Sequence, residues 1–350
     1  MARALELARR GHGQTSPNPL VGAVICSDGG SVGEGYHARL GDAHAEVAAL
    51  GAAGERARGA TLYVTLEPCN HRGRTPACTD AIISAGISRV VTATHDPNPD
   101  AAGGAERLRA AGITVDLGVL ETEARELNAA FFHSFSSERP FVTLKLAISL
   151  DGAIVGAEGA RQWITSESSR AEVHRLRAGS DAIAVGVQTA LADDPELTVR
   201  AALRPRRPPV RIVFDHTARL PAESVLARTA RDIPTLVVTA INVALPAELA
   251  EKGVEAMPAH DLGDALRQLR KRGVVSLMVE GGAGLAASFL GSRCVDRLII
   301  FQAPVILGER SLKAFSGVAA HDLASAPRFS VVSTARLEDD IMTVYSVAKQ

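Results

Sequence analysis

Residues 44–46 read His-Ala-Glu, and residues 67–78 read Glu-Pro-Cys-Asn-His-Arg-Gly-Arg-Thr-Pro-Ala-Cys. These two stretches offer one imidazole, from His44, and two thiolates, from Cys69 and Cys78, as metal ligands. Glu46 adds a carboxylate that need not bind the metal. Structural zinc sites are usually closed by four protein ligands, whereas catalytic sites keep a position for water, whose pKa the metal lowers to about 7. The pattern therefore predicts a zinc site with hydrolytic chemistry.

The local sequence around these residues predicts two helix starts. His44 and Glu46 open an Ala-rich helix, and Cys78 opens another, with Pro76 expected in its first turn. The partial positive charge of a helix N-terminus favours the thiolate form of Cys78. Glu46 lies two residues from a ligand, so it can take a proton from the attacking water and deliver it to a leaving amine.

Two other interpretations of the same residues stay open at this point. In the first, His44 only caps a helix and the two cysteines are ordinary buried thiols. In the second, the site is a closed structural zinc site with His71 as the fourth ligand, since Cys69-x-His71 is close enough to chelate. Such a site would leave Glu46 without a role, which favours the catalytic interpretation.

Composition limits the class of protein. The chain has 350 residues, enough for two domains, and it is 46% hydrophobic and 22% charged, with a formal net charge of -1. This balance predicts a globular protein without nucleic-acid partners. No apolar run approaches the roughly 18 residues that span a bilayer, and the segment from Met1 resembles an amphipathic helix more than a signal sequence. We therefore expect a cytoplasmic protein without a membrane partner. Cys26 and Cys294 are expected to be buried thiols, not a disulfide.

The pattern of apolar runs predicts α/β architecture in both halves of the chain. In the first half, strands are expected near 20–26, 60–66, 89–94 and 113–120, alternating with helices that start near residues 44, 76, 104 and 121. Small, polar and proline residues at 136–140 break the pattern, and a strand follows at 141–146. We therefore predict two domains, residues 1–138 and 139–350.

The second half contains a candidate cofactor site. Strands are expected near 182–187, 210–214, 235–239, 274–280 and 297–302, followed by an antiparallel hairpin of 329–337 and 341–347. Residues 280–284, Glu-Gly-Gly-Ala-Gly, follow one of these strands and lead into a helix. Such a turn can hold a cofactor diphosphate on free backbone amides, although a Gly-Gly pair can also simply end a strand.

Several longer motifs resemble one enzyme family. Residues 15–22 (Thr-Ser-Pro-Asn-Pro-Leu-Val-Gly), 33–37 (Gly-Glu-Gly-Tyr-His), 44–46 and 67–78 resemble the deaminase half of the bifunctional riboflavin-biosynthesis deaminase/reductases. A His-x-Glu with Pro-Cys and a later Cys is typical of zinc deaminases. The eight residues between the two cysteines are specific to this family, because cytidine and tRNA adenosine deaminases usually have two. Residues 145–152, 162–166, 192–200 and 279–282 are similar to the family's reductase half.

The resemblance implies a fold and two consecutive reactions. The expected fold is an N-terminal cytidine-deaminase-like α/β/α domain and a C-terminal dihydrofolate-reductase-like domain. The expected reactions are zinc-dependent deamination of 2,5-diamino-6-(5-phosphoribosylamino)pyrimidin-4(3H)-one and NADPH-dependent reduction of its ribosyl group, giving 5-amino-6-(5-phosphoribitylamino)uracil. A homo-oligomer is also expected. The alternatives are an active deaminase with an impaired reductase half and a zinc-stabilised binding or scaffold protein.

The resemblance also assigns residues. His44, Cys69 and Cys78 would hold zinc, and Glu46 would shuttle protons. The residues expected to contact the substrate are Asn18, Arg161, Arg177, Leu197, Arg200 and Glu280. Those expected to contact NADPH are Ala147, Trp163, Thr189, Asp193, His216, Gly282, Ala283, Gly284, Leu285, Ala286, Ala287 and Ser288. Arg161 and His216 depart from the family pattern, which usually has Ser at both positions. Residues 102–105 also lack a basic residue often found there.

Overall fold

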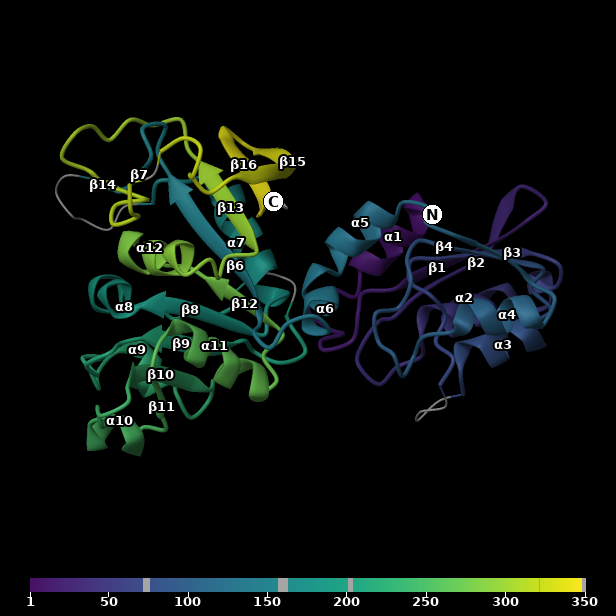
Figure 1. The fold of residues 1–350 in the computed structure, drawn as a ribbon, viewed down its shortest axis with the longest axis horizontal. Coiled ribbons are helices and arrows are strands. Elements are labelled where there is room, and N and C mark those ends of the chain that lie inside the picture. Colours follow the sequence, from purple (N-terminus) through teal and green to yellow (C-terminus); the bar gives the residue numbers. More distant parts are fainter. Residues whose placement is uncertain (72–75, 157–162, 201–203, 321, 348–350) are drawn as a thin grey trace. The chain divides into compact units, whose positions relative to one another are not determined.

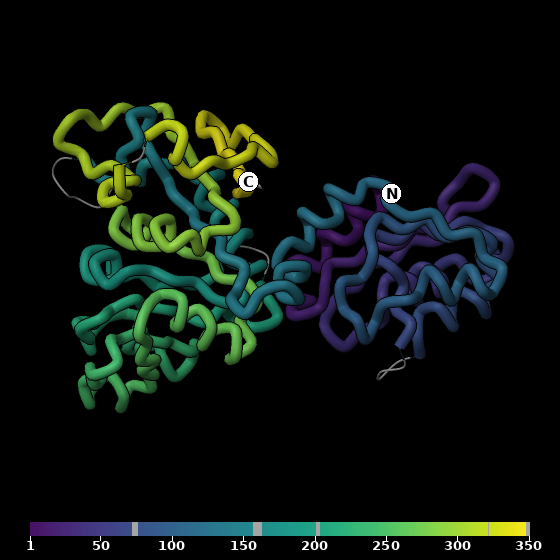
Figure 2. Tube along the Cα trace, in the orientation of Figure 1, coloured from purple at the N-terminus to yellow at the C-terminus, as the bar shows by residue number. Residues whose placement is uncertain are grey.

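The chain forms two compact units. The computed structural model describes residues 1–71, 76–156, 163–200, 204–320 and 322–347. The units are Met1–Ser137 and Glu138–Gln350, and they can be followed by colour along the ribbon (Figure 1) and the tube (Figure 2). Each unit has its own sheet and its own buried apolar core. Among the described residues, no helix is long and apolar enough to cross a membrane.

The first unit is built on a mixed sheet. In its described residues the sheet has five strands in the order β2-β1-β3-β4-β5. Strand β1 is antiparallel to β2 and β3, whereas β3, β4 and β5 are parallel. The strands are β1 (Gly22–Ser27), β2 (Gly30–Tyr36), β3 (Thr61–Val64), β4 (Arg89–Thr92) and β5 (Thr114–Leu117).

Helices cover both faces of this sheet. Alternate strand residues point to opposite faces, so apolar side chains can pack on both sides of the sheet. One layer packs against α2 (Ala45–Ala53), α3 (Cys78–Ser84) and α4 (Gly104–Ala110). The other packs against α1 (Ala2–Arg9) and α5 (Glu121–Leu127). A short 3-10 helix, Gly54–Ala57, follows α2, and α6 (Ala129–Ser134) ends the unit. The α/β/α architecture predicted for this half is confirmed.

Two glycines of β2 allow α2 to lie unusually close to the sheet. A Cβ atom added at Gly33 would lie 2.5 Å from the carbonyl oxygen of Ala49, and one added at Gly35 would lie 2.4 Å from the Ala49 nitrogen. Because these contacts are with backbone atoms, no side chain can replace glycine without moving the helix. The approach of α2, which begins immediately after His44, thus depends on the absence of side chains on β2.

The second unit is built on a larger sheet. In its described residues the strand order is β11-β10-β9-β8-β12-β6-β13-β16-β15. Neighbouring strands from β11 to β13 are parallel, whereas β16 and β15 extend the sheet as an antiparallel hairpin, as predicted. The bounds are β6 (Phe141–Ile148), β8 (Ala182–Gly186), β9 (Val210–Phe214), β10 (Thr235–Ala240), β11 (Glu255–Ala259), β12 (Ser276–Val279), β13 (Arg297–Gln302), β15 (Phe329–Leu337) and β16 (Asp340–Val347). A separate pair joins β7 (Ala153–Val155) to β14 (Leu312–Lys313).

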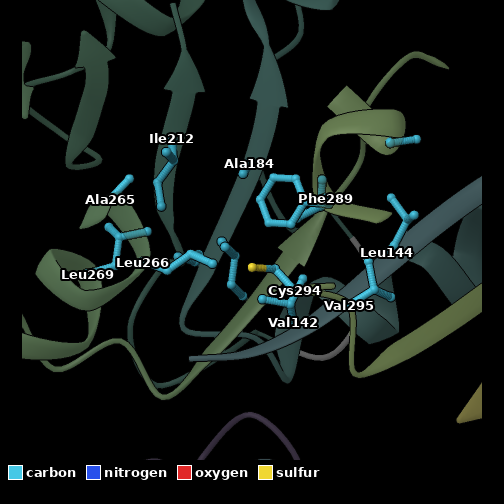
Figure 3. Packing of buried hydrophobic residues seen from close by; sticks show 14 of the residues in the cluster. Val142, Leu144, Ala184, Ile212, Ala265, Leu266, Leu269, Phe289, Cys294 and Val295 are labelled. Atoms are coloured by element: carbon cyan, nitrogen blue, oxygen red, sulfur yellow. The ribbon is translucent and has the colours of Figure 1, made fainter. Parts of the chain in front are cut away.

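The core of this unit lies mainly between the sheet and two helices. Helices α11 (Leu262–Lys271) and α12 (Ala283–Gly291) cover one face, where Phe289 is fully buried beside Leu144 and Ala184 (Figure 3). Helices α7 (Glu167–Ala178), α8 (Val187–Asp193), α9 (Val225–Arg228) and α10 (Ala247–Glu251) pack on the opposite face. Burying a phenylalanine side chain contributes about 1.5–3 kcal/mol. Strand β6 alternates, so Leu144 and Leu146 enter this core while Lys145 and Ala147 point to the face of α7.

Some local expectations were wrong. The sequence pattern did not predict β2, whose glycines have low strand propensity, or β11, which contains Pro258. Strands β7 and β14 are too short to leave an alternating pattern. Helix α3 begins at Cys78 with Ala77 as its N-cap, so Pro76 precedes the helix and does not form its first turn.

Candidate active sites

His44, Cys69 and Cys78 converge from three places in the first unit. His44 is the N-cap of α2, Cys69 follows β3, and Cys78 is the first residue of α3. Their ligand atoms all lie within 4.8 Å of one another. The His44 Nδ1 is 3.3 Å from the Cys78 Sγ and 3.6 Å from the Cys69 Sγ. A tetrahedral zinc site with usual bond lengths has nitrogen-to-sulfur edges of about 3.6 Å. The donor set therefore fits zinc, with one coordination position open for another ligand.

A closed structural site does not form from the residues considered for it. Within the described part of the chain, His71 is exposed and its ring does not join the group of three ligands. The open donor set agrees with a catalytic zinc site.

The two thiols of this cluster interact with each other. Hydrogen bonding with Cys78 lowers the pKa of Cys69, and the same interaction, together with burial, raises the pKa of Cys78. The Cys69 Sγ also accepts a hydrogen bond from the backbone amide of Cys78 over 3.4 Å. The hydrogen bond with Cys69 raises the pKa of His44. A bound zinc ion would deprotonate both sulfurs.

Glu46 lies beside the three ligands. It is in the first turn of α2 and only 4% exposed, and burial raises the pKa of its carboxyl to about 7. A carboxyl that titrates near neutral pH can both accept and release a proton, although a bound cation nearby would lower this pKa again. The fold therefore brings a candidate general acid/base next to the metal ligands.

Asn18 is held by a buried histidine. The Nδ1 of His37 lies 3.2 Å from the carbonyl oxygen of Ala43, so this nitrogen carries the proton and donates. The Nε2 of the neutral ring then accepts from the Asn18 Nδ2, which is 3.2 Å away. Burial lowers the pKa of His37, which favours the neutral ring. This arrangement fixes the Asn18 amide so that its Oδ1 points away from His37 as an acceptor.

Glu67 connects the segment that carries Cys69 to two other segments. Its buried carboxylate accepts hydrogen bonds from the Ala105 amide at 2.9 Å, the Asp96 amide at 3.3 Å and the His95 Nδ1 at 3.1 Å. Helix α4 also approaches closely here, because a Cβ atom at Gly104 would lie 1.9 Å from the carbonyl oxygen of Pro68. The loop after β4 and the start of α4 are thus fixed next to a metal ligand.

A cluster of three partly buried charges lies in the second unit. Glu280, which follows β12, binds Arg177 of α7 through two hydrogen bonds of 2.5 and 3.0 Å. The Lys145 Nζ of β6 is 3.8 Å from the same carboxylate. Burial alone would raise the pKa of Glu280, but the charges of Arg177 and Lys145 lower it, whereas burial lowers the pKa of Lys145. Arg177 also donates to the Thr198 carbonyl oxygen at 3.0 Å. The cluster therefore holds one carboxylate between two cations.

The residues expected to bind the cofactor gather partly around the start of α12. Gly282 is the N-cap of this helix, whose first two turns hold the other residues of the predicted run. A Cβ atom added at Gly282 would contact the Thr189 Oγ1 at 3.6 Å, and one added at Gly186 would contact the Leu285 Cβ at 3.6 Å. Helices α8 and α12 are thus in contact at the Gly-rich turn, where free amides can face a diphosphate.

The remaining predicted residues occupy separate positions. Leu197 is buried with a positive φ of 49°, and Arg200 forms an exposed ion pair with Glu196 at 2.7 Å. Trp163 is 63% exposed, and His216 lies exposed just after β9. Arg161 lies outside the described residues.

The fold and these two sites define a two-domain enzyme, a zinc-dependent deaminase joined to an NADPH-dependent reductase. Residues 1–94 match the cytidine and deoxycytidylate deaminase zinc-binding region, and residues 140–343 match the RibD C-terminal domain. The chain therefore belongs to the RibD family, the bifunctional deaminase/reductases of riboflavin biosynthesis. The family and fold predicted from the sequence are confirmed.

Individual relatives cover nearly the whole chain. The riboflavin biosynthesis protein RibD of Aquifex aeolicus is 49% identical over 88% of this chain and 87% of its own length, and that of Escherichia coli is 44% identical over 97% and 96%. The RibD structure of Acinetobacter baumannii matches with a TM-score of 0.87 and 37% identity, covering 99% of this chain and 98% of the other. The diaminohydroxyphosphoribosylaminopyrimidine deaminase/reductase of Thermotoga maritima matches with a TM-score of 0.88 and 37% identity, covering 99% and 97%.

Three residues at these sites received no role from the sequence. Lys145 alternates with buried leucines in β6, and a lysine at such a position usually faces solvent. His37 and Glu67 lie in motifs used for the resemblance, but their hydrogen-bond partners are distant in sequence. The signal that was available for Lys145 was a single charged residue in the middle of a mostly apolar strand.

Proposed function

We propose that this enzyme deaminates 2,5-diamino-6-(5-phosphoribosylamino)pyrimidin-4(3H)-one in its first unit and reduces the ribosyl group of the product in its second. The observation that supports this best is the presence of two chemically different clusters, one in each unit. The first is the zinc donor set with Glu46, and the second is the Lys145-Glu280-Arg177 cluster beside the Gly-rich turn. We also propose the predicted domain limits, residues 1–138 and 139–350.

The first reaction needs proton transfer at two moments. Zinc held by His44, Cys69 and Cys78 would act as a Lewis acid and lower the pKa of water. Glu46 would take the proton of the attacking water and pass it to the amine, which leaves poorly until it is protonated. The Asn18 Oδ1, oriented by His37, would accept a hydrogen bond from an N–H group of the substrate. One buried carboxyl thus serves both proton transfers.

The second reaction adds a hydride to the ribosyl carbon C1′ and a proton to the ring oxygen, which opens the sugar. Bound NADPH supplies the hydride. The partly buried Lys145 is the candidate donor of the proton, and Glu280 would hold both Lys145 and a sugar hydroxyl in place, with Arg177 fixing the carboxylate. Arg200 and Leu197 would complete the substrate contacts. NADPH would lie along Ala147, Trp163, Thr189, Asp193, His216 and residues 282–288.

The direct test is incubation with the diaminopyrimidine phosphate and NADPH, with the products resolved by mass. Deaminated and reduced products should appear in that order. A deaminated product that accumulates in the presence of NADPH would indicate the alternative of an impaired reductase half.

Removing one zinc ligand should separate the two activities. Cys78→Ser is expected to lower zinc content and the deamination rate together, because a hydroxyl is a poor zinc ligand compared with a thiolate. The rate of reduction of supplied deaminated substrate should stay within about twofold of the native rate, because the two domains have separate cores and damage to one need not unfold the other. Cys26→Ser, a substitution in β1 of the same unit, is the matched control. Zinc can be measured by atomic spectroscopy. Equal loss of both activities would contradict the division into two working domains.

The edge strand β15 supports a homo-oligomer. Among the residues that the structure describes it is the last strand of the sheet, and Val331 and Val332 are 61% and 38% exposed on it. An edge strand of this kind presents backbone hydrogen-bonding groups to another strand. We propose that β15 of a second copy covers it through a twofold axis, because such a pairing is self-complementary. A cytoplasmic location stays a prediction of the sequence.

Val331→Lys should weaken this association. A charge placed on the exposed edge must be desolvated on pairing, so we expect at least about a tenfold higher dissociation constant of the dimer. Sedimentation velocity over a range of concentrations measures this. Val119→Lys, the same substitution at a 40% exposed valine of the first unit, is the control. A native protein that stays monomeric, or a variant with unchanged association, would reject the proposed interface.

A further inference from the structure

The turn between β15 and β16 reaches the start of helix α7. Asp340, the first residue of β16, is only 3% exposed, and its Oδ2 accepts two hydrogen bonds. One comes from the Ser166 amide at 2.7 Å and the other from the Ser169 hydroxyl at 2.6 Å. The Ser166 hydroxyl in turn donates to the Leu337 carbonyl oxygen at 3.3 Å. The C-terminal hairpin is therefore joined to the first turn of a helix more than 160 residues earlier in the sequence.

These bonds make Asp340 a fixed point for the helix start. A buried carboxylate is stable only where donors replace its water, and here both donors belong to the N-terminus of α7, where the helix dipole also favours negative charge. Ser166 is the N-cap residue of the helix, and its hydroxyl oxygen accepts a hydrogen bond from the Ser169 amide at 3.2 Å. The first turn is thus capped both by its own serine and by the hairpin.

The next residue of this turn extends the contacts to Trp163. The Arg170 Nη1 donates to the Thr165 carbonyl oxygen at 2.8 Å, and the Arg170 guanidinium lies 5.4 Å from the centre of the Trp163 ring. This distance is within the range of a cation–π interaction. The Trp163 side chain is largely exposed, and the Arg170 guanidinium is one of the groups that contact it.

We propose that Asp340 and Arg170 are positioning residues for the reductase: Asp340 fixes the first turn of α7, and Arg170 on that turn orients Trp163 toward NADPH. The inference rests on the proposed role of Trp163 as a cofactor contact. It implies that the C-terminal hairpin, although it contributes no proposed contact to NADPH itself, influences the affinity for the cofactor.

Trp163 is the single tryptophan of the chain, so its fluorescence reports on this network directly. The experiment compares the full-length zinc-loaded protein with Asp340→Ala, Ser169→Ala and Arg170→Met. Asp340→Asn is the conservative variant, because its amide oxygen can still accept both hydrogen bonds. Asp339→Ala is the matched control, because Asp339 is adjacent but its side chain is 82% exposed. Trp163 emission and its quenching by acrylamide are measured first, without cofactor. The KM for NADPH, the kcat of reduction and the rate of deamination are then measured for each variant.

We expect altered emission and an approximately tenfold higher KM for NADPH in the three main variants, the effect of losing about one hydrogen bond to a charged group. The kcat of reduction and the deamination rate should stay within about twofold, since the reacting groups are untouched. Asp340→Asn should restore most of the native behaviour. If Asp340→Ala does not fold, Ser169→Ala and Arg170→Met carry the test.

Two results would overturn the proposal, and they differ in meaning. Unchanged emission in Ser169→Ala and Arg170→Met would show that the network does not position Trp163. Altered emission with an unchanged KM for NADPH would show that this network does not set the affinity for the cofactor. The proposed function fails separately, if the native protein does not reduce the supplied deaminated substrate with NADPH.

Discussion

Glu46→Gln is expected to lower the deamination rate at least about 100-fold while zinc stays bound, the typical loss when one general acid/base is removed. Glutamine keeps the shape of the side chain but cannot accept the proton of the attacking water or deliver it to the leaving amine. The amide also fits the buried position of Glu46 without introducing a charge, so folding should be preserved. Ammonia release and zinc content, measured on the same sample, test both parts of this expectation.

The control is Glu55→Gln, the same substitution at an exposed glutamate of the same unit. Reduction of supplied deaminated substrate serves as a second control within each molecule. Ammonia release close to the native rate at full zinc occupancy would show that another group moves the protons.

Lys145→Met is expected to lower the rate of reduction at least about 100-fold and to leave deamination unchanged. Methionine keeps most of the apolar stem of lysine but has no proton to donate. Glu280 keeps its two hydrogen bonds to Arg177, so its partly buried charge remains paired. If the lysine supplies the proton, the native rate should fall as the pH rises through the Lys145 pKa, which burial places below its ordinary value.

Lys271→Met, at an exposed lysine of α11, is the matched control. The double variant Lys145→Met with Glu280→Gln adds a further test, because residues that act as one unit give losses that do not add. Full additivity would show that Glu280 does not act through Lys145, and a single Lys145→Met variant that still reduces at the native rate would exclude Lys145 as the proton donor.

The zinc site was predictable because its ligands and its acid/base residue lie in short, characteristic sequence motifs. His44, Cys69 and Cys78 are recognisable from ligand type and spacing, and Glu46 from its place two residues after a ligand. The alternation of strands and helices was also visible, because each buried strand leaves an apolar run. The charged cluster of the second unit was less accessible. Lys145, Arg177 and Glu280 come from β6, α7 and the end of β12, so only the sheet order brings them together.

Other features depend on contacts that have no local signal. The orientation of Asn18 follows from the tautomer of His37, which is set by the carbonyl oxygen of Ala43. Strand β2 was not predicted because its glycines suggest a loop, and their actual reason, the close approach of α2, exists only in the folded unit. A sequence pattern indicates which chemistry a residue can perform. These features depend instead on which residues become neighbours in the folded protein.

The glycines of β2 have a consequence for the tolerance of this enzyme to random substitution. An alanine at Gly33 or Gly35 would push against the backbone of α2 and displace the turn that begins with His44 and Glu46. Neither glycine contacts the metal, yet a selection for variants without deaminase activity should recover them alongside the ligands themselves. In a mutational scan of this domain, the positions most sensitive to substitution would therefore include the catalytic residues, helix α2 and the two glycines of β2. Positions that matter for backbone packing would be as sensitive as those that take part in the chemistry.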